Sequence, residues 1–238
     1  MKRVLVTGPV DRLAEYAASA RAAGWEAVET PLLRIEARRF QSSDLAHAQY
    51  DWICVTSASA LPWLAAAIEA RPDLRASPVA AVGERTAERV RALGLALGSP
   101  PALDAEALAA GLAARARAGA RVLWPRGSVS SDLASALRAA RVDVDVDDPI
   151  AYETRALERP DPFPPSAAIF FASPSAVRAW HERDAESDPR LAIAIGRTTF
   201  DALLHETQAR FFDTISLPQP TPEAFAAVLA HLDPEKSR

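Results

Sequence analysis

Two short hydroxyl-rich segments each follow an apolar, strand-like run and precede a helix-like stretch. One holds Thr56, Ser57 and Ser59 in Thr56-Ser57-Ala58-Ser59-Ala60, and the other holds Ser173 and Ser175 in Ala172-Ser173-Pro174-Ser175-Ala176. At such a turn a hydroxyl can cap the helix, and the free backbone N–H groups and the helix dipole attract anions. A single occurrence favours capping. Two copies at matched positions leave capping and anion binding as equal alternatives.

A second pair of turns has the same form. Gly83-Glu84-Arg85-Thr86 and Gly196-Arg197-Thr198-Thr199 each place a glycine after an apolar run and a hydroxyl at a helix start. This arrangement is again typical of anion binding, and it makes Thr86, Thr198 and Thr199 candidate ligand contacts. Neither G-x-G-x-x-G nor G-x-x-x-x-G-K-[ST] is present, so the fingerprints of dinucleotide and nucleoside triphosphate sites are missing.

Two further segments carry groups suited to an anionic substrate. Arg126 and Ser128, in Pro125-Arg126-Gly127-Ser128, follow an apolar run and would add a guanidinium and a hydroxyl, although an arginine there is also typical of a solvated surface. Tyr152 lies in Tyr152-Glu153-Thr154. A phenol is protonated at neutral pH, so it serves as a proton donor or hydrogen-bond anchor more readily than as a base. Packing at a strand edge is the equal alternative for this tyrosine.

Other catalytic machinery is scarce. The four histidines lie at 47, 181, 205 and 231, without the spacing of metal ligands, and the single cysteine, Cys54, lies inside an apolar run. A buried thiol is the simplest interpretation of Cys54. There is no G-x-S-x-G elbow, and no Ser-His-Asp triad can be assembled. We therefore expect neither a metal nor a cofactor.

The elements that position these groups occur twice along the chain. Val4-Leu5-Val6 returns as Val122-Leu123-Trp124, 118 positions later, and Ala81-Val82-Gly83 returns as Ala194-Ile195-Gly196, 113 positions later. In each half, short apolar runs alternate with longer amphipathic stretches, which is typical of a parallel sheet covered by helices on both faces. The pattern predicts an α/β protein of two Rossmann-like lobes, and two such lobes facing one another would leave a cleft.

Two stretches, Leu32–Phe40 and Pro149–Leu157, depart from this alternation and read as extended connectors at corresponding places of the repeat. If the chain crosses at both, a discontinuous lobe of residues 1–34 and 158–238 joins a lobe of residues 38–150 through connectors at about 32–40 and 149–157. Two consecutive domains would show the same apolar pattern, so both arrangements stay open.

Composition narrows the classes of partner. The chain has 238 residues, with 27 Lys and Arg against 31 Asp and Glu, a formal charge of −4. With no Lys/Arg run, no surface for nucleic acid or membrane is expected. The start of the chain lacks the apolar segment of a secretory signal, and no run is long enough for a membrane helix. We expect a cytoplasmic monomer that acts on a small molecule.

The ordered motifs resemble those of the uroporphyrinogen-III synthase family over nearly the whole chain. The resemblance rests on short turns in a fixed order: Val-Leu-Val-Thr, Val-Thr-Ser-Ala-Ser, Ala-Val-Gly-Glu-Arg-Thr-Ala, Leu-Trp-Pro-Arg-Gly, Tyr-Glu-Thr, Phe-Ala-Ser-Pro-Ser-Ala-Val and Ile-Gly-Arg-Thr-Thr. It implies two Rossmann-like α/β lobes joined by a two-stranded connector, with the chain crossing twice between the lobes. It also implies a hydro-lyase that closes hydroxymethylbilane to uroporphyrinogen III, with loss of water and inversion of the last pyrrole ring.

Carried over residue by residue, the resemblance assigns carboxylate binding to hydroxyls of both lobes and assistance to the chemistry to Tyr152. The carboxylate-binding hydroxyls are Ser57, Ser59 and Thr86 on one lobe and Ser173, Thr198 and Thr199 on the other. Gly8 departs from the family pattern, in which many members have arginine before the proline. The resemblance requires no cofactor, and it allows the substrate to be handed over by hydroxymethylbilane synthase.

Two other functions fit the same predicted cleft. A non-catalytic module would bind a tetrapyrrole or another polycarboxylate, but the appended effector domain that would favour it is absent from this sequence. A bilobal protein for a small sugar or nucleotide would need phosphate motifs that the sequence lacks. Fold similarity alone leaves all three open, and the order of the motifs favours the synthase.

Overall fold

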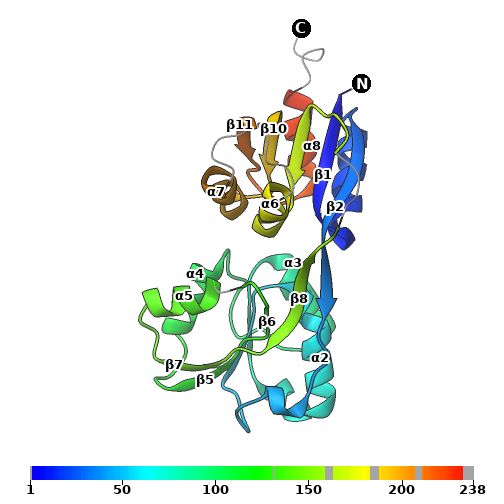
Figure 1. The fold of residues 1–238 in the computed structure, drawn as a ribbon. Helices are drawn as coiled ribbons and strands as arrows, with labels where there is room; N and C mark the ends of the chain where they lie inside the picture. The colour runs from blue at the N-terminus through cyan, green and yellow to red at the C-terminus, as the bar shows by residue number, and fades with distance from the viewer. Residues whose placement is uncertain (1, 131, 159–162, 183–187, 207–210, 233–238) are drawn as a thin grey trace. The chain divides into compact units, whose positions relative to one another are not determined.

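The computed structural model describes residues 2–130, 132–158, 163–182, 188–206 and 211–232 (Figure 1). The chain forms two compact units. One comprises Met1–Arg34 and Arg155–Arg238, and the other comprises Ile35–Thr154. We call them the discontinuous unit and the continuous unit.

The discontinuous unit is built on a parallel sheet. Strand order across it is β11-β10-β9-β1-β2. Its elements are β1 (Arg3–Pro9), η1 (Val10–Arg12), α1 (Leu13–Ala22), the first part of β2 (Glu26–Ala37), β9 (Ala168–Phe171), α6 (Pro174–His181), β10 (Asp188–Ala194), α7 (Arg197–Glu206), β11 (Phe211–Ser216) and α8 (Pro222–His231). Strands β1 and β9 are buried along nearly their whole length, as expected for parallel strands covered on both faces.

Alternation along β1 separates two cores in this unit. Val4 and Val6 point to one face, where they pack with residues of α1 and α8 such as Tyr16 and Phe225. Leu5 points to the other face, where it packs with residues of α6 and α7. Because successive side chains of a strand point to opposite faces, one apolar run supplies both cores. The result is a sheet between two helix pairs, α1 with α8 and α6 with α7.

The continuous unit repeats this plan around a four-stranded parallel sheet of order β4-β3-β5-β7. Its elements are the end of β2, η2 (Ser42–Asp44), β3 (Trp52–Val55), η3 (Ala58–Ala60), α2 (Leu61–Ala70), η4 (Pro72–Ala76), β4 (Val79–Ala81), α3 (Glu84–Ala92), α4 (Ala105–Ala113), β5 (Ala120–Leu123), β6 (Arg126–Gly127), α5 (Asp132–Ala139), β7 (Val144–Asp147) and most of β8 (Ile150–Ala156). Ile53 and Val55 face the core that holds α2, whereas Cys54 faces the core under α4 and α5.

Strands β2 and β8 carry the chain between the units. The boundary at 34/35 falls within β2 and the boundary at 154/155 falls within β8, and the two strands are neighbours in one sheet (Figure 1). Leu157 N donates to Leu32 O at 2.8 Å and Arg38 N donates to Ala151 O at 2.9 Å, a pairing of opposite direction. The predicted fold class is confirmed: two α/β lobes with parallel sheets, a two-stranded connector and two crossings. Among the described residues, no helix is long and apolar enough to cross a membrane.

Candidate active site

The turn after β3 holds its hydroxyls through a tryptophan and a short helical cap. The indole nitrogen of Trp124, a fully buried residue, donates to Thr56 Oγ1 at 3.1 Å. Ser57 Oγ accepts from Ser59 N at 3.3 Å, and Ser57 thereby caps η3. With its oxygen occupied as acceptor by Trp124, the Thr56 hydroxyl keeps its own proton for donation. Ser57 therefore caps the helix at this turn, and the hydroxyl of Thr56 stays available as a hydrogen-bond donor.

The matching turn in the discontinuous unit also caps its helix. Ser173 Oγ accepts from Ala176 N at 3.2 Å at the start of α6, and Pro174 occupies the first helical position, where no N–H is needed. Ser175 lies in the first turn and accepts from Arg178 Nη2 at 3.2 Å. Both serines are half-buried, so their hydroxyls lie within reach of solvent.

The two glycine turns bury one hydroxyl each. Thr86 in α3 is only 8 % exposed and the equivalent Thr199 in α7 only 1 %. Thr199 Oγ1 is buried and meets no hydrogen-bond partner among the described residues, whereas the preceding Thr198 is exposed. At the other turn, Gly83 N donates to Ala102 O at 2.8 Å, so this backbone donor is already occupied. Thr198 is thus the hydroxyl of these turns that faces solvent.

Arg126 is held at the start of β6 by three kinds of contact. Its Nε donates to Asp148 Oδ2 at 2.7 Å, its Nη1 donates to Gly127 O at 3.2 Å, and its guanidinium lies 5.9 Å from the centre of the Trp124 ring. The side chain is 21 % exposed. Asp148 offsets part of the positive charge, so Arg126 is a fixed, partly compensated cation.

Tyr152 lies half-buried on β8 and pairs with Gly127 of β6. Its carbonyl oxygen accepts a hydrogen bond from Ser128 N at 3.0 Å. Ser128 itself is exposed. The ring packs against the hydrophobic core of β3 and α2. Tyr152 therefore combines a fixed backbone with a ring that is covered on one side.

Contacts between elements gather the predicted residues within each unit. In the continuous unit, η3 contacts both α3 and β6, and β6 pairs with β8. The turn of Thr56, Ser57 and Ser59 therefore lies beside the helix of Thr86 and the strand of Arg126. In the discontinuous unit, α6 packs on α7, which places the Ser173 turn beside the helix of Thr198 and Thr199.

Three residues that complete this arrangement were absent from the predicted site. Trp124 links Thr56 to Arg126, Asp148 pairs with Arg126, and Gly127 lies under Tyr152. Gly127 lies between two predicted residues, Trp124 lies two positions before Arg126, and Asp148 directly precedes a predicted connector. The position of Trp124 at the end of a buried strand, next to a proline, is the sequence feature that could have indicated its role.

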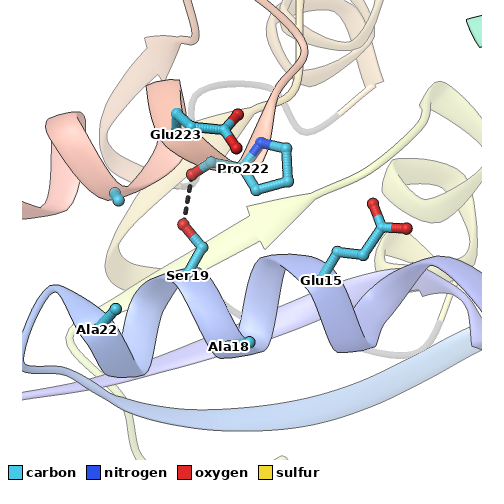
Figure 2. Close-up of a pocket in the computed structure, with 7 residues that line it drawn as sticks. Glu15, Ala18, Ser19, Ala22, Pro222 and Glu223 are labelled. Atoms are coloured by element: carbon cyan, nitrogen blue, oxygen red, sulfur yellow. Dashed lines mark hydrogen bonds between the residues drawn. The ribbon is translucent and has the colours of Figure 1, made fainter.

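A separate hollow of about 720 Å³ lies between α1 and α8 (Figure 2). It is lined by Glu15, Ala18, Ser19, Ala22, Pro222, Glu223 and Ala226. The Ser19 hydroxyl donates to the Pro222 carbonyl oxygen across it. None of the predicted site residues lines this hollow, and its two carboxylates would repel a polycarboxylate ligand.

Cys54, on the strand that leads to Thr56, is fully buried, and burial raises the pKa of its thiol to about 12. Such a thiol stays protonated and is a poor nucleophile.

Within the described part of the chain, no group of three His, Cys, Asp or Glu side chains could hold a metal ion. The predicted site residues themselves carry hydroxyls, the Arg126 guanidinium and the Tyr152 phenol.

Comparison with solved structures defines the class of protein to which this fold belongs. The uroporphyrinogen-III synthetase of Helicobacter pylori 26695 is 18 % identical, with a TM-score of 0.66 over 98 % of this chain and 100 % of that chain. A mutant uroporphyrinogen III synthase from the extremely thermophilic bacterium Thermus thermophilus is 20 % identical, with a TM-score of 0.65 over 98 % and 97 %. The chain has the two-lobed α/β fold of these structures.

The family model described as uroporphyrinogen-III synthase HemD matches residues 14–225. This chain belongs to the uroporphyrinogen-III synthase family, and its function lies in haem biosynthesis. No curated protein matches the sequence. Nothing in these comparisons favours the non-catalytic binding module.

Proposed function

We propose that the chain is a cyclising hydro-lyase that converts hydroxymethylbilane to uroporphyrinogen III, with inversion of the last pyrrole ring. The observation that carries the proposal is the family match over residues 14–225. In this reaction the carbon–oxygen bond of the hydroxymethyl group breaks, and the hydroxyl leaves as water. The freed methylene carbon bonds to the already substituted α-carbon of the last ring. The bond from that α-carbon to its old bridge carbon then breaks, and the bridge carbon bonds to the free α-carbon of the same ring, which loses its proton.

We assign carboxylate binding to the hydroxyl turns of both units. The substrate carries eight carboxylates, which suits hydroxyls and backbone N–H groups at helix starts better than it suits an extended basic patch. The assigned residues are Thr56, Ser57, Ser59, Thr86, Arg126, Ser128, Ser173, Ser175, Thr198 and Thr199. These residues differ in burial: Thr198 and Ser128 are exposed, whereas Thr86 and Thr199 are almost fully buried.

Tyr152 is assigned to the departure of the hydroxyl. A pyrrole nitrogen of the substrate supplies the electron pair that expels hydroxide, and the phenol donates a hydrogen bond or proton to the leaving oxygen. The bilane also closes unaided to the uninverted isomer. The protein must therefore favour closure through a strained spiro intermediate, and positioning should contribute more than acid catalysis.

We further propose that the protein works as a cytoplasmic monomer that receives its unstable substrate from hydroxymethylbilane synthase. The single, buried Cys54 is consistent with a reducing compartment. Gel filtration coupled to light scattering tests the oligomeric state.

The test of function is to give the purified protein freshly generated hydroxymethylbilane, oxidise the products and separate type I from type III uroporphyrin. A dominant type III product supports the proposal. Type I alone, at the rate of a buffer control and from protein that melts cooperatively, would refute it and favour a binding module. Isothermal titration with uroporphyrin III would then measure that binding.

A further inference from the structure

Gly127 leaves no room for a side chain beneath Tyr152. A methyl group built on its Cα would lie 2.7 Å from Tyr152 Cε2, 2.7 Å from Cζ and 2.9 Å from the phenolic oxygen. Distances under about 3.0 Å do not occur between a Cβ and a neighbouring heavy atom without displacement. The phenol end of the Tyr152 ring therefore rests directly on the backbone of Gly127.

The pairing of β6 with β8 produces this contact. Gly127 and Tyr152 are paired directly after a register shift between Arg126 and Gly127. Ser128 N donates to Tyr152 O at 3.0 Å, and Arg126 N donates to Pro149 O at 3.0 Å. The backbones on both sides of the contact are thus fixed by hydrogen bonds. Gly127 is buried, and β6 is the last strand of its sheet.

Backbone conformation does not explain the glycine. Gly127 is not among the glycines with positive φ, so an alanine could adopt its backbone angles. The atoms that an alanine would strike belong to the far end of a side chain, which can rotate, and not to the backbone. Substitution should therefore displace the phenol before it distorts the sheet.

We propose that Gly127 is a positioning residue that sets the orientation of the Tyr152 phenol in the reaction. This inference rests on the proposed function and goes beyond it, because it assigns a role to a residue that itself offers no reactive group. The competing explanation is purely structural: an aromatic ring often covers a glycine on a neighbouring strand and protects the exposed backbone at a sheet edge. Under that explanation, stability would change and the chemistry would not.

The experiment compares Gly127→Ala with Gly111→Ala as the matched control. Gly111 lies in α4 of the same unit, where an added methyl would meet only Arg115 Nη1 at 3.8 Å. The chain has three tyrosines, so protein labelled with ¹³Cε-tyrosine gives a simple aromatic NMR spectrum, and Tyr152→Phe assigns the Tyr152 signal. We expect Gly127→Ala to shift that signal alone and Gly111→Ala to shift none of the three.

In the enzyme assay, we expect Gly127→Ala to lower kcat by about tenfold or more, with KM within about twofold, because small misplacements of a catalytic group are costly. In a Tyr152→Phe background, the same substitution should change kcat by less than about twofold, since the hydroxyl is already gone. An unmoved Tyr152 signal, or an equal loss of kcat in both backgrounds, would overturn the proposal.

Three further outcomes are informative. If Gly127→Ala does not fold, adding Tyr152→Ala should restore folding by removing the ring, and failure to restore it would overturn the proposed contact. If the wild-type protein makes no type III product, the proposed function fails and so does the positioning role of Gly127 in the reaction, whatever the NMR spectrum shows. A wild-type enzyme that is active, with Gly127→Ala equally active, refutes the positioning role alone.

Discussion

Trp124 Nε1 donates a hydrogen bond to Thr56 Oγ1 at 3.1 Å, and this contact joins the ends of two neighbouring strands, β5 and β3. Trp124 is fully buried in the core under α4 and α5. A buried indole N–H without an acceptor costs free energy, so Thr56 stabilises the unit as well as presenting its proton to solvent.

Thr56→Val should therefore lower the free energy of unfolding by about 1–3 kcal/mol, the cost of leaving a buried donor unsatisfied. Thr56→Ser keeps the oxygen and should cost clearly less. Urea denaturation followed by tryptophan fluorescence measures both. Equal stability of the valine and wild-type proteins would show that the Trp124 N–H finds another acceptor.

Tyr152→Phe removes one oxygen and keeps the ring on Gly127. We expect kcat to fall by about 100-fold, at the lower end of what acid–base catalysis contributes, because the substrate itself supplies the electron pair that expels hydroxide. Type III should remain the main product. Tyr16→Phe, in the core of the discontinuous unit, is the control and should keep kcat within about twofold. Unchanged turnover in Tyr152→Phe would remove the assignment.

The strands that position the site were predictable because they are continuous apolar runs. Parallel strands buried on both faces have this pattern, and Trp52–Val55 is a clear example. The alternating pattern of apolar and amphipathic stretches did not single out helix α4, whose sequence is rich in alanine. The Asp104 cap, whose carboxylate accepts from Ala107 N at 2.8 Å, was the available indication of a helix start. Strand β7, with two aspartates in four residues, was not singled out either.

The candidate site was predictable in its positions but not in its contacts. Hydroxyls at strand ends can be located from local sequence, since each follows an apolar run. The hydrogen bond between Thr56 and Trp124 joins residues 68 positions apart and depends on the tertiary packing of β3 beside β5. The contact of Tyr152 with Gly127 likewise depends on strand register, which no local pattern specifies.

Gly8 shows why the family's arginine would not fit at this position of the chain. Its φ is +151°, and an added Cβ would lie 2.7 Å from Ala172 Cβ, beside the Ser173 turn. Gly8→Ala should combine backbone strain with overpacking, each about 1–3 kcal/mol. Gly24→Ala is the control: φ there is +88°, and nothing lies within 4 Å of the added Cβ. Thermal unfolding of both variants should show the larger loss for Gly8→Ala, and equal losses would mean that the close approach to Ala172 is relieved cheaply.

Cys54 should report the opening of the continuous unit. It is the single cysteine of the chain and is fully buried, so a thiol reagent at pH 8 should label it only when the unit opens, and rapidly in denaturant. Rapid labelling of native protein would contradict the buried placement.

The same thiol should make stability depend on alkaline pH. Burial raises its pKa from 9.0 to about 12, so the unfolded chain loses this proton first as pH rises. The stabilisation is complete below about pH 9 and is lost progressively towards pH 12. Burial and the hydrogen bond to Asp147 also raise the pKa of Tyr50, which adds to the loss of stability at higher pH.

Cys54→Ala removes the thiol contribution and should give a shallower decline in the free energy of unfolding between pH 9 and 11, measured by urea denaturation. Parallel slopes for the variant and the wild type would show that the Cys54 thiol does not contribute to this decline.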